Sequence, residues 1–366
     1  MDKKMKIGVV GAGAISDIYL QNMINRFDCL EVKSICSKHM EHALEKAAKY
    51  GLLAYTYSEM LADNEIDMIV NLTPVGAHFN IIREALLAGK HVYTEKTITE
   101  EREQAAELLQ IAAEKNLYLG AAPDTFLGSS LQTARAAIEE GKIGNVTSVA
   151  VAANRNNDFL TSRFSFLREP GAGILKDYSV YYLTALVSLL GPVSQVAAYT
   201  RTVYEQRTNV LPTSPEYGQT IQTPNESIVS AILQFESGIT GTLHINAESN
   251  REDRADMVIY GTEGMLLLGD PNAFGKPIKW IPGGAFTKSL EATTLEPVNS
   301  YSDNCRGIGP AEMAMAIWQN KPNRANKEMA YHVLDVICAL EESAKEGKFV
   351  TVVSRCERPE PLRNRL

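Results

Sequence analysis

The chain has 366 residues and a formal net charge of −8, with 45% hydrophobic and 22% charged residues. This composition is ordinary for a soluble globular protein, and the length suits two domains better than one compact core. No block of five or more lysines and arginines occurs. Nucleic acid and anionic membranes are therefore not expected as partners.

Membrane insertion and metal binding are also not expected. No apolar run reaches the roughly 18 residues that span a bilayer, and the first predicted strand begins too early to leave room for a signal peptide. The five cysteines are scattered and form no CxxC pair or Cys/His ligand spacing. We therefore expect a cytoplasmic protein with reduced thiols and no metal site.

The first 37 residues contain a strand–turn–helix–strand pattern. The apolar run 7–10 predicts a strand, Gly11 and Gly13 follow at once, residues 14–25 predict a helix, and residues 32–36 predict a second strand. Glycines at this spacing between a strand and a helix are typical of a dinucleotide-binding turn. The alternative is an ordinary strand–turn–helix unit with two incidental glycines.

The chemistry of a dinucleotide requires these residue types. Gly11 permits a tight turn, and Gly13 lets the backbone approach a pyrophosphate, which the following helix N-terminus stabilises. Ser16 takes the third motif position, where a small residue keeps the helix close to the strand. We expect Gly11, Gly13, Ala14 and Ile15 to bind the cofactor.

The end of the second strand bears on the choice between NAD and NADP. An acidic residue at this position would bind the ribose 2′-hydroxyl of NAD, but the sequence reads Cys36-Ser37-Lys38-His39. A hydroxyl followed by a cation suits a 2′-phosphate better. The cofactor is therefore NAD(P), with NADP slightly favoured over NAD, unless Lys38 is only a solvated residue at a helix start.

Strands and helices alternate over the rest of residues 1–122. The predicted strands and helices are 40–50, 68–72, 79–88, 91–94, 100–115 and 117–121. This alternation predicts a Rossmann-type, doubly wound parallel sheet, whose ligands bind beyond the carboxyl ends of the strands. The residues that follow two of these strands are therefore further cofactor candidates: Thr73, Pro74, His78, Glu95 and Lys96. His78 either contacts the cofactor or caps the next helix.

Residues 123–366 show a different pattern and predict a second domain of the α+β class with a large, open, mostly antiparallel sheet. The clearest strands and helices are 129–140, 146–153, 177–190, 228–235, 238–246, 257–260, 265–268, 310–319 and 327–345. Residues 208–223 are polar and read as a surface loop, and the tail 357–366 reads as extended.

Several of these motifs together resemble one family of oxidoreductases. They are Gly8–Ser16, Thr73-Pro74 with His78, Ala88–Val92 with Glu95-Lys96, Asp177–Thr184, Ala122–Gly128, Arg306–Met313 and Tyr331–Asp335. The combination resembles the glucose-fructose oxidoreductase, inositol dehydrogenase and rhizopine-catabolism (Gfo/Idh/MocA) family over nearly the whole chain.

The resemblance implies a Rossmann domain, a second α+β domain, and hydride transfer between NAD(P) and a polyol, sugar or cyclitol carbon. It also implies catalytic roles for Lys96, which follows Glu95, and for Asp177. The family often has a histidine at the position of Tyr181 and an aspartate at that of Thr184. Thr97 replaces the proline that usually follows the lysine, and Ser179 replaces a glycine.

Oxidation of a secondary alcohol needs a base for the hydroxyl proton. Lys96 is our candidate for the principal acid/base, with Tyr181 as proton partner or hydroxyl ligand and Asp177 orienting the substrate. Asp177 and Tyr181 are four residues apart, so they share a helix face, and a nearby Lys⁺ would lower the pKa of the tyrosine. Alternatively, Lys96 is a surface lysine, Tyr181 a packing aromatic, and Asp177 a residue favoured by the helix dipole.

Polar residues near the expected cleft are further substrate candidates: Asp124, Asn154, Arg155 and Arg163. They either bind sugar hydroxyls or belong to a solvated loop.

Three functions remain open at this point. The first is an NAD(P)-dependent dehydrogenase acting on a ring secondary alcohol of a sugar, of a glycoside, for example at C3 of a glucoside, or of a cyclitol. The second is a cofactor-retaining enzyme that cleaves a glycosidic bond by transient oxidation, in the manner of a glycosidase or lyase. The third is a non-catalytic, dinucleotide-sensing regulator. By analogy with the family, we expect a homo-oligomer formed through the sheet of the second domain.

Overall fold

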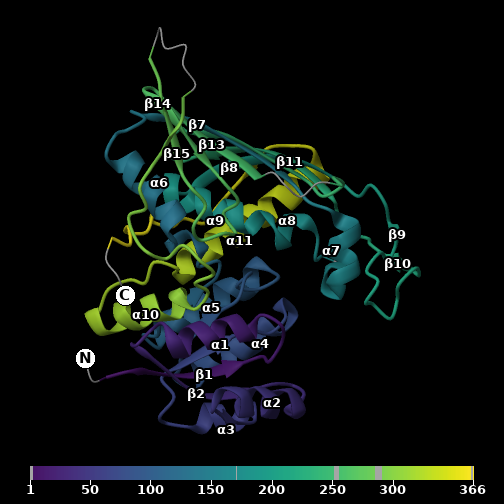
Figure 1. Ribbon diagram of the computed structural model, residues 1–366, viewed down its shortest axis with the longest axis vertical. Helices are drawn as coiled ribbons and strands as arrows, with labels where there is room; N and C mark the ends of the chain where they lie inside the picture. The colour runs from purple at the N-terminus through teal and green to yellow at the C-terminus, as the bar shows by residue number, and fades with distance from the viewer. Residues whose placement is uncertain (1–2, 170, 251–254, 285–290, 364–365) are drawn as a thin grey trace.

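The computed structural model describes residues 3–169, 171–250, 255–284, 291–363 and 366. Figure 1 shows a small sheet at one end of the long axis, a large sheet at the other end, and helices between them. No helix in the described part of the chain is long and apolar enough to cross a membrane.

The first sheet is parallel throughout, with strand order β3-β2-β1-β4-β5-β6. Its strands are β1 (Met5–Val10), β2 (Leu30–Cys36), β3 (Leu53–Ala54), β4 (Met68–Asn71), β5 (His91–Thr94) and β6 (Leu119–Ala121). Its helices are α1 (Ser16–Asn25), α2 (Met40–Tyr50), α3 (Tyr57–Ala62), α4 (His78–Leu87) and α5 (Arg102–Glu114). The strand order reverses between β1 and β4, which is where doubly wound sheets bind their ligands.

The second sheet has nine strands in the order β16-β15-β14-β13-β7-β12-β11-β8-β17. They are β7 (Val146–Asn154), β8 (Val193–Arg201), β11 (Ile228–Phe235), β12 (Thr240–Asn246), β13 (Ala255–Gly261), β14 (Gly264–Leu268), β15 (Lys279–Pro282), β16 (Thr293–Thr294) and β17 (Val350–Thr351). Among the described strands of this second sheet, only the pair β7–β12 is parallel. The predicted fold class, a parallel Rossmann sheet followed by a mostly antiparallel sheet, is confirmed.

One face of the large sheet is covered by helices, as Figure 1 shows. The remaining helices are α6 (Ser129–Glu139), α7 (Asn157–Arg163), α8 (Ile174–Asp177), α9 (Ser179–Leu190), α10 (Ile308–Gln319) and α11 (Lys327–Glu346). Side chains alternate between buried and exposed along β11 and β12. This alternation is expected of a sheet with one covered face and one open face.

Hydrophobic side chains form two clusters on opposite faces of the small sheet. The larger cluster contains Ile7 and Val9 of β1 and continues through α9 and α11 to the large sheet. The smaller one contains Val10 and packs under α4 and α5. β4 is buried along its whole length, which explains its uninterrupted apolar sequence.

The end of the chain returns to the first sheet. The N–H of Ala121 in β6 donates to the carbonyl of Ala325 at 3.1 Å. A Cβ added at Gly309 in α10 would meet the Tyr93 hydroxyl of β5, so α10 packs tightly on this edge. Residues near 309 and 325 therefore belong structurally to the surroundings of β5 and β6.

The structure differs from the local predictions at three places. Residues 208–223 were expected to be a loop. They contain the last residue of β9 (Gln206–Thr208) and all of β10 (Thr220–Gln222), which pair as a small antiparallel hairpin. No helix was predicted over α7, where a solvated loop was one of two alternatives for Arg163. The predicted helix 177–190 is present as α9 over Ser179–Leu190, and Asp177 ends the preceding α8.

The glycine turn after β1 yields a stability prediction. Gly11 has φ +108°, and a Cβ there would meet the backbone carbonyl of Leu72 at 2.8 Å, whereas a Cβ at Gly13 meets nothing within 4 Å. We expect Gly11→Ala to lower the free energy of unfolding of the cofactor-free protein by about 1–3 kcal/mol. The matched variant Gly13→Ala should stay within about 0.5 kcal/mol of wild type. Urea unfolding measures both, and equal losses would contradict this account of the turn.

Candidate active site

Lys96 and Asp177 form an ion pair that joins the two sheets. Lys96 follows β5, and its Nζ donates to Asp177 Oδ1 at 2.5 Å and to the Asp177 carbonyl at 2.9 Å. Both side chains are largely out of water, with 16% and 24% exposed. Burial lowers the pKa of Lys96, but Asp177 and Tyr181 outweigh it, so the net pKa is raised and the ammonium form is favoured.

Tyr181 lies beside this pair in the first turn of α9. The Lys96 Nζ is 5.4 Å from the centroid of its ring. The charge of Lys96 does lower the pKa of Tyr181, as expected, but burial has the larger effect and the net pKa is raised. The phenol is therefore neutral at physiological pH and can both donate and accept a hydrogen bond. The structure thus brings the three predicted catalytic residues together.

His78 holds the turn that carries Lys96. The ring is fully buried; its Nδ1 is 2.7 Å from the carbonyl of Thr97 and its Nε2 is 2.8 Å from the carbonyl of Thr73. Burial lowers its pKa. His78 is the first residue of α4 and makes no side-chain capping bond. The ring therefore lies between the turns after β4 and β5 and in its neutral form donates to one of the two carbonyls. The cofactor contact of His78 stays a prediction.

The glycine turn after β1 fits a dinucleotide. Gly13 and Ala14 are exposed, and the space beyond Gly13 is open. Ile15 occupies the N-cap position of α1, so no side chain caps the first N–H groups of this helix. The Ser16 hydroxyl donates to the Gly13 carbonyl at 2.7 Å and fixes the turn. Free N–H groups at a helix start beside open space are suited to a pyrophosphate.

The other predicted cofactor residues also follow strands of the small sheet. Ser37 is half-buried and Lys38 exposed after β2. After β4, the Thr73 hydroxyl donates to Asn71 at 2.8 Å, and Pro74 is exposed. After β5, Glu95 accepts from the Tyr19 hydroxyl at 2.7 Å. Because β2, β1, β4 and β5 are neighbours, these residues lie along one edge of the sheet.

Asp124 is placed differently from the prediction that it contacts the substrate. It is 1% exposed, and its carboxylate accepts from the N–H groups of Gly307 and Gly309, each at 3.1 Å. Burial raises its pKa to about 6, although the charge of Arg306 opposes this shift. Asp124 therefore fixes the turn at the start of α10.

Arg306, the residue before that turn, was not among the predicted site residues. It donates to Asn272 at 2.6 Å and Asn304 at 2.9 Å and lies over the Phe274 ring. Burial lowers its pKa, but the nearby groups, chiefly Tyr181, raise it overall. The motif that begins at Arg306 supported the family resemblance, but its place in space depends on Asp124, which is far away in the sequence.

The remaining substrate candidates separate from one another. Arg155 stacks on Tyr178, with its guanidinium carbon 4.5 Å from the ring centroid. Arg163 is exposed on α7 and lies over the rings of Phe159 and Phe164, and its predicted contact with the substrate stays a prediction. Asn154 is half-buried and ends β7, in register with Asn246 of β12.

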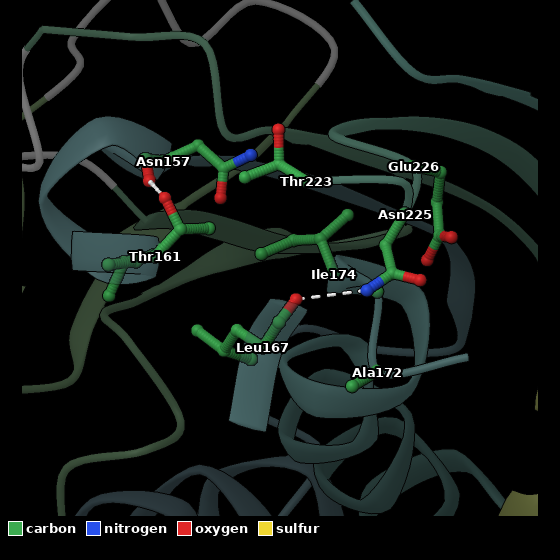
Figure 2. A pocket seen from close by; sticks show the side chains of 10 residues that line it. Asn157, Thr161, Leu167, Ala172, Ile174, Thr223, Asn225 and Glu226 are labelled. Atoms are coloured by element: carbon green, nitrogen blue, oxygen red, sulfur yellow. Dashed lines mark hydrogen bonds between the residues drawn. The ribbon is translucent and has the colours of Figure 1, made fainter. Parts of the chain in front are cut away.

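A small pocket lies next to α8, and Figure 2 shows the residues that line it. Hydrogen bonds from Thr161 to the Asn157 carbonyl and from Asn225 to the Leu167 carbonyl close its sides. Its volume of about 20 Å³ accommodates about one water molecule. Lys96, Asp177 and Tyr181 do not line it, so we do not assign it to the substrate.

The parallel sheet, its glycine turn and the strand-end residues are the features of a dinucleotide-binding domain. Residues 5–122 match the model of the oxidoreductase family with an NAD-binding Rossmann fold, and residues 131–267 match the Gfo/Idh/MocA C-terminal domain. The chain belongs to the Gfo/Idh/MocA family, and the resemblance stated from its motifs is confirmed.

Individual relatives agree with this assignment. An uncharacterized protein of Saccharomyces cerevisiae is 30% identical, over 95% of this chain and 98% of that protein. The scyllo-inositol 2-dehydrogenase (NADP(+)) of Bacillus subtilis is 23% identical over 56% of each chain. This chain also spans about half the length of several other curated relatives. Levoglucosan dehydrogenase in its apo form has the same fold, with a TM-score of 0.85 at 19% identity, covering 97% of this chain and 100% of that one.

The raised pKa of Asp124 predicts a pH-dependent stability. The folded state binds the proton of Asp124 more tightly than the unfolded state, because the pKa rises from 3.8 to about 6. The stability that this group contributes is therefore complete below about pH 4 and is lost as the pH rises through about 6. Asparagine does not titrate in this range. The free energy of unfolding of Asp124→Asn minus that of wild type should therefore increase by about 1–3 kcal/mol as the pH rises from about 4 to 7.

Urea unfolding of both proteins over this pH range measures the difference. Asp303→Asn is the control of opposite sign, because bonds to Cys305 and Arg26 lower the pKa of that exposed carboxyl. A difference in stability between wild type and Asp124→Asn that is constant with pH would contradict the account.

Proposed function

We propose that this chain is an NAD(P)-dependent dehydrogenase that transfers a hydride between nicotinamide and a ring secondary alcohol of a sugar, glycoside or cyclitol. The observation that carries the proposal is the Lys96–Asp177 pair with Tyr181 at the edge of the dinucleotide-binding sheet. Relatives named as inositol and levoglucosan dehydrogenases support the substrate class.

Each of the three residues has a distinct proposed role. When bound, the nicotinamide supplies or accepts the hydride. Lys96 donates a proton to the forming alcohol oxygen and takes it back in the reverse reaction. Tyr181, neutral because of its burial, hydrogen-bonds the same oxygen. Asp177 keeps Lys96 charged and pointed at the site.

The raised pKa of Lys96 bears on the direction of the reaction. At neutral pH the ammonium already carries the proton that reduction of a ketone requires. Oxidation of the alcohol requires the neutral amine, so we propose that the oxidation rate increases with pH while reduction is favoured near neutrality.

The cofactor-retaining glycosidase and the dinucleotide-sensing regulator predict different behaviour. A buried ion pair is costly to desolvate. A regulator that performs no chemistry would therefore not need to keep the pair of Lys96 and Asp177. A cofactor-retaining enzyme would release product without net formation of NAD(P)H. No contact in the described residues favours either over the dehydrogenase.

The open face of the large sheet is the proposed subunit interface. Tyr199, Ile232 and Tyr260 share this face, with 65%, 50% and 38% of their surface exposed. Large apolar side chains on one exposed sheet face are typical of an interface. The homo-oligomer and the cytoplasmic location stay predictions.

Lys96→Ala tests the catalytic assignment. We expect it to lower kcat by about 10²- to 10⁴-fold, because the proton donor is lost, while the affinity for NADPH changes little. Lys176→Ala is the matched control, since Lys176 lies next to Asp177, is similarly buried and pairs with Glu341 at 3.3 Å. Steady-state kinetics and NADPH fluorescence titration are the readouts. Retained turnover in Lys96→Ala would refute the assignment.

Ser37→Asp tests the proposed preference for NADP. A carboxylate at the end of β2 repels a 2′-phosphate and accepts a bond from a 2′-hydroxyl. The ratio of NADP to NAD affinity should therefore fall, by about tenfold or more for about 1.4 kcal/mol of repulsion. Ser58→Asp, on the exposed side of α3, adds the same charge as a control. An unchanged ratio of affinities in Ser37→Asp would contradict the proposed preference for NADP over NAD.

A further inference from the structure

Two arginines near the Lys96 site form no direct ion pair among the residues that the structure describes, although Asp124 and Glu95 lie near enough to raise the pKa of Arg306. The guanidinium of Arg155 lies over the ring of Tyr178, and its Nε is buried without a hydrogen-bond partner. The guanidinium of Arg306 bonds only to the side-chain oxygens of Asn272 and Asn304. Because a guanidinium carries five donor N–H groups, most of the donors on both side chains remain available.

The nearest carboxylates are engaged elsewhere. Asp270 accepts from the Tyr178 hydroxyl and from the N–H of Asn272, each at 2.9 Å. Asp124 accepts two backbone N–H groups, and Glu95 accepts a tyrosine hydroxyl. None of the three forms an ion pair with either arginine in the described part of the chain. A half-buried cation without a direct anion is costly unless a ligand supplies one.

A series of contacts links both arginines to Tyr178, the neighbour of the catalytic Tyr181. Arg155 stacks on Tyr178, whose hydroxyl bonds Asp270, and Asp270 and Asn272 lead to Arg306. The rings of Tyr178 and Tyr181 are 6.3 Å apart. Arg306 is close enough to Tyr181 for each to shift the pKa of the other, and Arg155 is linked to this tyrosine through Tyr178.

We propose that the substrate carries an oxyanion group, a carboxylate or a phosphate, which binds to Arg306 and Arg155 while a nearby hydroxyl-bearing carbon reacts at Lys96. The proposal rests on the proposed dehydrogenase function and narrows its substrate class to polyhydroxylated acids and phosphate esters. The planar fork of a guanidinium matches both kinds of oxyanion, whereas neutral sugars leave its charge unbalanced.

The phosphates of the dinucleotide do not explain these arginines. The pyrophosphate candidate site is the turn from Gly11 to Ser16, and no described contact of the Arg155 or Arg306 side chain involves that turn. Removing either arginine should therefore leave the affinity for NADPH nearly unchanged, which separates a substrate role from a cofactor role.

The test compares acids with their neutral counterparts. The NADP-loaded protein is assayed with D-glucuronate, D-glucose 6-phosphate and D-glucose. We expect kcat/KM to be about 10- to 100-fold higher for a charged compound than for its neutral counterpart. Glucuronate and glucose 6-phosphate distinguish a carboxylate from a phosphate as the group recognised.

Variants connect the preference to the arginines. Arg155→Gln and Arg306→Gln should each raise KM for the preferred charged compound by about 10- to 100-fold, with little change for the neutral one. Arg168→Gln is the matched control, because Arg168 is also half-buried but pairs with Glu216 at 2.6 Å. Loss of the preference in either variant supports the proposal, and its retention in both overturns it.

Calorimetry of the NADP-loaded protein with D-glucuronate, D-glucose 6-phosphate and D-glucose runs in parallel. If neutral sugars react as well as the charged ones, the dehydrogenase stands and the oxyanion proposal fails. If no compound reacts, the proposed function fails, and the binding data still decide whether the oxyanion site exists. Tighter binding of a charged compound supports the oxyanion site, and equal binding overturns it.

Discussion

The ion pair between Lys96 and Asp177 is the contact on which the site depends. It connects the carboxyl edge of the parallel sheet to the end of α8, over a sequence separation of 81 residues. Both side chains are mostly withdrawn from water, so the loss of either partner would leave an unbalanced charge at a cost of about 3–5 kcal/mol. The pair therefore constrains how the two sheets meet. It also places Tyr181, in the next helix, against the same ammonium group.

The residues around this pair keep its geometry fixed. The His78 ring lies between the carbonyls of Thr73 and Thr97, which follow β4 and β5, and in its neutral form it donates to one of them. On the other side, Asp124 anchors the turn that presents Arg306. Such pre-formed donors require no rearrangement during a reaction, which is how polar sites stabilise developing charge. The fold thus supplies a rigid edge, and the side chains on that edge supply the chemistry.

Local patterns in the sequence predicted most of the fold, because strand and helix periods are set by neighbouring residues. The end of β5 identified Lys96, and the spacing of Gly11 and Gly13 identified the dinucleotide turn. Arg306 was missed because its position depends on the bond from the N–H of the next residue, Gly307, to Asp124, which is 183 residues away in the sequence. No local pattern in the sequence records such a contact. The neutral state of Tyr181 was missed for a related reason: burial, a property of the whole fold, outweighs the charge of its neighbour.

A crystal structure of the protein with bound NADP⁺ tests the central claim most directly. The account predicts that the reactive C4 of the nicotinamide faces Lys96 and Tyr181, that the pyrophosphate lies at the start of α1, and that the Lys96–Asp177 contact persists. A nicotinamide placed away from Lys96, or an Asp177 turned away from it, would contradict the proposal that this ion pair forms the reaction centre.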